Sequence, residues 1–256
     1  MAKPNLIARS ALLIFFVASL GFSAVIALVT HATGNEKIAI LIPLSPSLIA
    51  IIITVSGSGR RGLRAMFEGR LVGGLNLGWS LVALLLFPAV AAAALLIHSL
   101  FGGPEPGLRT TALIPQVIVI LLISLGEEFG WRGFALPRLQ ERFSALNASL
   151  LLGLVWGFWH FPGFLIGTGV PSDMPFAMFL YWIVLATILM TWVYNHTGGS
   201  ILSAILMHSA GNAAFNYLPL LPQWVGQLTT FSLFLGLLSV FAAFVVTRLG
   251  DDKQAS

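Results

Sequence analysis

Long apolar stretches dominate this sequence and constrain what the chain can fold into. About eight of them follow one another, each close to the roughly 20 residues that a helix needs to cross a bilayer. Only 9% of the 256 residues are charged and 57% are hydrophobic, whereas an average soluble domain is about 25% charged. This composition excludes a soluble enzyme, a disordered chain and a nucleic-acid-binding protein. We therefore predict an all-α, polytopic bundle of about eight transmembrane helices, at residues 6–30, 38–55, 75–100, 108–136, 147–166, 176–194, 200–217 and 224–247.

The basic residues predict how the bundle is oriented. Cytoplasmic loops of membrane proteins carry an excess of Lys and Arg. If the N-terminus is cytoplasmic, all 13 Lys and Arg residues except Lys37 and Arg109 fall on the inner side. We therefore expect both termini in the cytoplasm. Because the loops are short, we expect an integral protein of a bacterial inner membrane. Residues 1–256 form one membrane domain in this interpretation, and 108–217 carry the motifs described next.

The first motif lies near the end of the fourth apolar stretch and contains Glu127, Glu128 and Arg132. Charged residues inside a membrane are costly and usually mark a functional site. Glu128 and Arg132 are four residues apart, so they share a helix face and can form an ion pair. Glu127 lies about 100° around the helix from Glu128. We therefore predict that Glu127 projects unpaired into a cavity, where it can act as a general base.

The second motif centres on His160 in the fifth stretch. Trp156 lies one turn earlier and can pack on the imidazole. Ser149, Gly153 and Gly157 repeat every four residues, which predicts close approach of another helix. Pro162 weakens the helix just after His160.

The third motif lies in the seventh stretch, where His208 and Asn212 are four residues apart and point the same way. A polar stripe on an apolar membrane helix must face protein or water. From the helical rise, Glu127, His160 and His208 lie about 15, 20 and 12 Å from the cytoplasmic end. We therefore expect them to line one cavity that opens toward the cytoplasm.

The remaining ionisable groups are expected at the surface, including His31, His98 and His196. The segment 60–70, with several arginines between apolar residues, is compatible with two structures. It can form a short amphipathic helix in the membrane interface or a basic cytoplasmic loop.

A carboxylate, two histidines and an amide around a wet cavity suit hydrolysis. A carboxylate and a histidine can deprotonate water, while a second histidine and an Asn can stabilise an oxyanion. Alternatively, Glu127, His160 and His208 can hold a divalent metal such as zinc, which lowers the pKa of bound water. The sequence has no Cys, no H-E-x-x-H motif and no Asp within a predicted span, which argues against other intramembrane hydrolase chemistries.

The ordered motifs resemble those of the CPBP intramembrane proteases. That family includes the type II CAAX prenyl endopeptidases and the bacterial Abi and bacteriocin-processing proteins. Its pattern is E-E-x-x-x-R, F-x-x-x-H and H-x-x-x-N, and Trp156 replaces the Phe here. The resemblance implies an intramembrane endopeptidase of metallo- or glutamic type.

In this resemblance Glu127 and His160 activate water. His208 and Asn212 stabilise the transition state or bind a metal, and Glu128, Arg132 and Trp156 support them. The implied partner is a membrane-associated peptide or protein in the lipid bilayer, and not nucleic acid. Two other functions stay open at this point. One is a non-catalytic binding, immunity or scaffold protein, and the other is a proton-coupled transporter.

Overall fold

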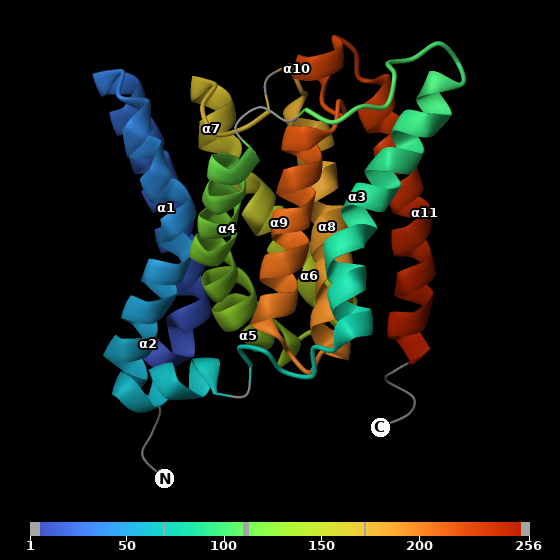
Figure 1. The fold of residues 1–256 in the computed structure, drawn as a ribbon. Helices are drawn as coiled ribbons and strands as arrows, with labels where there is room; N and C mark the ends of the chain where they lie inside the picture. The colour runs from blue at the N-terminus through green and yellow to red at the C-terminus, as the bar shows by residue number, and fades with distance from the viewer. Residues whose placement is uncertain (1–5, 69, 110–112, 172, 252–256) are drawn as a thin grey trace.

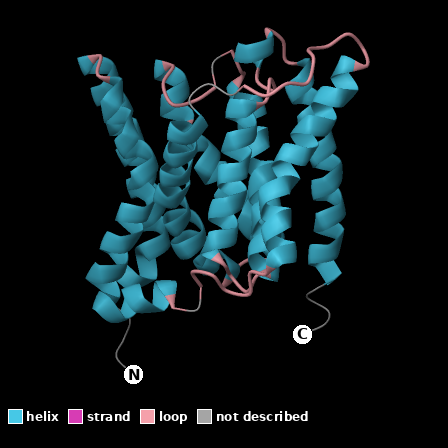
Figure 2. Cartoon of the chain, in the orientation of Figure 1, coloured by secondary structure: helices cyan, strands magenta, loops and turns pink. Residues whose placement is uncertain are grey.

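The computed structural model describes residues 6–68, 70–109, 113–171 and 173–251, and this part of the chain is helical with no strand (Figure 2). Its elements in chain order are α1 (Leu6–Thr33), η1 (Glu36–Ile40), α2 (Leu41–Phe67), α3 (Leu77–Ser99), α4 (Leu113–Gly130), the π-helical segment η2 (Trp131–Ala135), α5 (Leu136–Gln140), α6 (Ala145–Trp159), α7 (Phe161–Ile166), α8 (Phe176–His196), α9 (Ile201–Tyr217), α10 (Pro222–Val225) and α11 (Thr229–Asp251).

The long helices stand side by side as a bundle, and the start of α1 and the end of α11 lie at the same end of it (Figure 1). Seven helical runs of the described residues are long and apolar enough to cross a membrane. The eighth, α9, has 17 residues and is packed against α3, α4 and α8. The predicted all-α bundle of about eight membrane helices is confirmed.

The segment after the second span is helical rather than a loop. Helical hydrogen bonding continues through α2 as far as Phe67, but Gly59 adopts a left-handed φ of 59° and bends the chain there. Figure 1 shows the last part of α2 running across the end of the bundle. Met66 is buried on this part, while Arg60, Arg61 and Arg64 are exposed. The segment is therefore a helix with a buried apolar side and exposed arginines, as expected for an amphipathic helix rather than a loop.

Small residues let two pairs of helices approach closely. A Cβ on Gly126 would lie 2.7 Å from the Pro43 carbonyl oxygen, and one on Gly130 would lie 2.6 Å from that of Pro46. These contacts seat α4 directly against α2. The predicted close approach of another helix at Gly153 of α6 is confirmed. A Cβ on Gly153 would lie 3.0 Å from the Cα atom of Val184 on α8. Both contacts hold the helices that carry the motifs at backbone distance from their neighbours.

One expected surface residue is buried. The side chain of His98 is 8% exposed, and its Nδ1 lies 2.8 Å from the Thr230 hydroxyl of α11. The prediction failed because the sequence does not reveal that α11 returns to cover the end of α3. His31 and His196 are exposed, as expected.

Candidate active site

The end of α4 brings the first motif into the centre of the bundle. Glu127, Glu128 and Arg132 are all buried, with exposures of 3%, 0% and 0%. The α-helix changes to the π-helical segment η2 immediately after Gly130. Pro137 lies just beyond and lacks the N–H that would bond the Gly133 carbonyl, which favours a break in the α-helical pattern here. Single π-helical turns of this kind are often found at functional sites.

Glu128 is the hub of a buried ionic network. Its Oε1 accepts a hydrogen bond from Nη1 of Arg132 at 2.9 Å and another from Nδ1 of His208 at 2.8 Å. The predicted pair between Glu128 and Arg132 is therefore present. Nη2 of Arg132 also contacts the Met190 sulfur at 3.3 Å, on α8. This network connects α4, α8 and α9. It also fixes the orientation of the His208 ring.

Trp156 connects all three motifs. Its indole Nε1 donates a hydrogen bond to Oε2 of Glu127 at 2.8 Å. The Arg132 guanidinium lies 4.4 Å from the centroid of the same ring, in cation–π contact. The ring also packs edge-on against His208, with 5.3 Å between centroids. We expected Trp156 to act as an aromatic packing group, and the structure adds a hydrogen bond that a Phe at this position cannot make.

His160 is held by its backbone and by aromatic rings. Its Nδ1 lies 2.9 Å from the Trp156 carbonyl oxygen, so Nδ1 carries the proton and Nε2 is left as an acceptor. Trp159 and Phe179 clamp the ring edge-on, at centroid distances of 4.7 and 5.0 Å. The helix ends at Trp159, as Pro162 predicts, and the Trp159 carbonyl accepts a hydrogen bond from the Ser23 hydroxyl at 2.8 Å.

The third motif supplies groups on the other side of the cavity. Because Nδ1 of His208 faces Glu128, its Nε2 is the nitrogen left for a ligand. Asn212 is half-buried and lines the same cavity one turn further along α9. Its backbone carbonyl accepts a hydrogen bond from the side chain of Asn216 at 2.8 Å.

Glu127, Trp156, His160, His208 and Asn212 all line one cavity of about 550 Å³. The structure thus brings together every residue that the sequence proposed for catalysis. Most of the remaining wall is aromatic or aliphatic, including Phe87, Ile120, Phe179, Trp182 and Ile183. A cavity with few polar groups on an apolar wall is typical of a ligand site.

The cavity opens at the end of the bundle opposite the termini. Its rim includes Glu36 and Lys37 of η1, Val170 in the loop after α7, and Gln223 of α10 (Figure 1). We expected the cavity to open toward the cytoplasm with both termini on that same side, but its opening and the termini lie at opposite ends of the bundle. Depth along a helix does not reveal which side is closed, and the fully buried Arg132 closes the bundle on the terminal side.

The expected metal ligands do not converge as a metal site. Among the described residues, no group of three His, Asp or Glu side chains lies close enough to share a metal ion. Oε2 of Glu127 is also already bonded to Trp156. The residues present therefore do not fit a metal held jointly by Glu127, His160 and His208.

The sequence analysis did not identify two residues that support the groups of the candidate site. Ser23 bonds the Trp159 carbonyl from α1, and Met190 contacts Arg132 from α8. Neither belongs to a motif, and no signal in one sequence links positions so far apart. Only the packing of the helices reveals them.

Comparison with known proteins finds similarity in the segment that carries the three motifs. Residues 109–214 match the model of the Rce1-like type II CAAX prenyl endopeptidases. These residues hold Glu127, Glu128, Arg132, His160, His208 and Asn212. The matched segment and its motifs are thus similar to those of the CPBP intramembrane proteases. It is also similar to CAAX prenyl protease 2 of Methanococcus maripaludis, with 30% identity over 181 residues. That match covers 64% of this chain and 66% of the archaeal protein, just under two thirds of its length. Seven apolar helical runs of spanning length, together with this similarity, indicate an integral membrane protein.

Proposed function

We propose that this protein is an intramembrane endopeptidase that hydrolyses a peptide bond of a membrane-associated substrate. The observation that carries this proposal is the placement of two acceptors, Glu127 and Nε2 of His160, on the same cavity as Nε2 of His208 and the amide of Asn212. The first pair suits the deprotonation of water, and the second pair suits the stabilisation of an oxyanion.

In the first step a water molecule donates one hydrogen bond to Glu127 and one to His160. Glu127 takes a proton from it, and the water oxygen attacks the carbonyl carbon of the scissile bond. The carbonyl oxygen becomes an oxyanion, which accepts hydrogen bonds from the Asn212 amide and from Nε2 of His208 when that ring carries both protons. The intermediate then collapses as protonated Glu127 gives its proton to the leaving nitrogen. The products are a carboxylic acid and an amine, and the acid then passes its proton to the amine to give a carboxylate and an ammonium group.

The surrounding groups position these residues. The indole of Trp156 holds one oxygen of Glu127 and leaves the other for water. The carbonyl of Trp156 fixes the tautomer of His160, and Glu128 fixes the orientation of His208. Fixed donors and acceptors of this kind lower the cost of reorganisation during the reaction. We propose that water activation proceeds in this way without a shared metal ion, that is, by the glutamic rather than the metallo type of mechanism.

The shape of the cavity supports a substrate with an apolar segment next to the scissile bond. Its walls carry Phe87, Phe179, Trp182 and other apolar side chains. The archaeal relative is named a CAAX prenyl protease, so a lipid-modified tail is one substrate of this chemistry. In a bacterium the leader of a secreted peptide, a bacteriocin or an anchored regulator carries a comparable segment.

The test uses purified full-length protein in liposomes, mixed with solubilised membrane proteins from cells that lack the gene. New peptide N-termini are then identified by mass spectrometry. We expect termini that appear with wild type and are reduced by roughly 10²–10⁴-fold with Glu127→Gln, which removes the proposed general base. If wild type produces no new termini, the proposed protease activity is refuted, and a binding or scaffold role becomes the better interpretation.

A further inference from the structure

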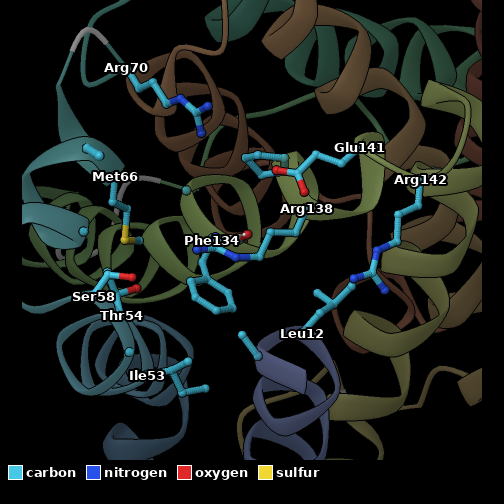
Figure 3. Close-up of a pocket in the computed structure, with 16 residues that line it drawn as sticks. Leu12, Ile53, Thr54, Ser58, Met66, Arg70, Phe134, Arg138, Glu141 and Arg142 are labelled. Carbon is cyan, nitrogen blue, oxygen red and sulfur yellow. Dashed lines mark hydrogen bonds between the residues drawn. The ribbon is translucent and has the colours of Figure 1, made fainter. Parts of the chain in front are cut away.

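A second cavity lies at the other end of the bundle, on the side that carries the termini. It has a volume of about 380 Å³ and is bounded by α1, by α2 on both sides of its bend, and by η2 and α5 (Figure 3). The proposed catalytic groups do not line it. The bend at Gly59 turns the end of α2 across the bundle, and residues on both sides of the bend line the cavity.

Three arginines surround this cavity. Figure 3 shows Arg70, Arg138 and Arg142 at its edge. Arg138 is half-buried and held in place, because its Nη1 donates to the Phe134 carbonyl at 2.8 Å and its guanidinium lies 3.7 Å from the centre of the Phe134 ring. A guanidinium fixed in this way still has N–H groups left for a ligand.

No ion pair neutralises these arginines in the described part of the chain. The ion pairs found there join Arg64 to Glu68, and Arg132 and His208 to Glu128. Glu141 also lines the cavity, but it forms no ion pair with Arg70, Arg138 or Arg142. Three arginines against one carboxylate leave the lining with a net positive charge.

Hydroxyl groups face the arginines from α2. The Oγ1 atom of Thr54 is buried and has no hydrogen-bond partner among the described residues. It lines the cavity together with Ser58, which lies one turn further along α2 (Figure 3). A buried hydroxyl without a partner is costly, and a polar ligand that reaches this side of the cavity would satisfy it.

The location decides which anion fits. The cavity lies beside the interfacial part of α2, at the end of the bundle rich in Lys and Arg, and Leu12, Ile53 and Met66 add apolar surface to it. Basic pockets between membrane helices at this face bind phosphate-bearing lipid headgroups. We propose that this cavity binds the phosphate of an anionic lipid headgroup, with the arginines on the phosphate and the Thr54 hydroxyl as a further donor.

The experiment measures lipid binding by the full-length protein in a neutral detergent after delipidation. Phosphatidylglycerol, phosphatidylcholine with the same acyl chains, and inorganic phosphate are titrated separately, and bound lipid is counted by native mass spectrometry. We expect saturable binding of phosphatidylglycerol. The double variant Arg70→Gln/Arg142→Gln should weaken it roughly twenty-five-fold, because each basic group near an anionic headgroup is worth about fivefold in affinity.

The matched control is Arg60→Gln/Arg61→Gln, which removes the same charge from exposed positions of the same face outside the cavity. We expect it to bind like wild type. Equal loss in both double variants would overturn the proposal, because it would indicate attraction to the whole basic face. Equal binding of phosphatidylcholine would overturn it as well, and so would competition by inorganic phosphate at the lipid's own concentration. Thr54→Val, which keeps the shape, provides a second variant with a smaller expected loss in the same assay.

Discussion

The indole nitrogen of Trp156 donates a hydrogen bond of 2.8 Å to Oε2 of Glu127. This contact orients the proposed base and also distinguishes this chain from the Phe-containing motif that it resembles. A Phe in the same place would keep the ring contacts with Arg132 and His208 but leave Glu127 without this donor.

Trp156→Phe should therefore lower kcat by about tenfold, the lower range for loss of a hydrogen bond to a charged group. KM should change little, because Trp156 acts on Glu127 rather than on the substrate. The measurement is steady-state cleavage in liposomes. Trp192→Phe is the matched control, since it removes an indole N–H near the end of α8, outside the cavity lining, and should leave kcat unaltered. Unchanged kcat in Trp156→Phe would refute the positioning role.

The buried pair of Glu128 and Arg132 should dominate stability. Arg132→Met leaves the Glu128 carboxylate buried beside His208 alone, and removal of one partner from a buried pair costs about 3–5 kcal/mol of unfolding free energy. The double variant Glu128→Gln/Arg132→Met should recover part of that loss, because neither charge then remains.

The exposed pair Arg64 and Glu68 provides the comparison. Its side chains are 78% and 62% exposed, so Arg64→Met should cost about 0–1 kcal/mol. Unfolding in detergent is followed by tryptophan fluorescence. If Arg132→Met were no less stable than Arg64→Met, the buried network would not contribute as described.

The cavity mouth and the basic end of the bundle should lie on opposite sides of the membrane. The chain has no Cys, so single cysteines can be labelled without background. If the termini are cytoplasmic, as the distribution of basic residues predicts, Lys37→Cys reacts with a membrane-impermeant maleimide in intact cells. Arg61→Cys then reacts only after permeabilisation. Labelling of both positions from the same side would contradict the arrangement.

Chelators should leave the activity intact. Because Glu127, His160 and His208 do not converge on a shared metal position, cleavage by protein treated with EDTA and dialysed is expected to match untreated protein. Added zinc should not increase it. Loss of activity on chelation, restored by one equivalent of zinc, would show that a metal takes part and that these side chains rearrange to bind it.

The sequence alone predicted the bundle and the grouping of the three motifs, because both depend on local patterns. Apolar length predicts spans, and spacing of four residues places Glu128 with Arg132 and His208 with Asn212 on shared faces. The stripe through Gly153 likewise predicted close approach of another helix, which the structure identifies as α8.

The features that were missed depend on contacts between distant segments. His98 is buried because α11 covers it, and the cavity opens away from the termini because Arg132 closes the other side. The hydrogen bond from Trp156 to Glu127 joins two helices whose relative rotation one sequence does not fix. Helical periodicity describes one helix at a time. Contacts between different helices could therefore be identified only from the three-dimensional structure.

The most direct test of the proposed protease compares protein N-termini in cells that carry wild type, Glu127→Gln or Glu68→Gln at equal expression. Glu127→Gln preserves the shape of the base and removes its charge, and Glu68→Gln makes the same change at an exposed position. We predict a set of membrane-protein N-termini that is present with wild type and Glu68→Gln and absent with Glu127→Gln. Identical termini in all three strains would contradict the account.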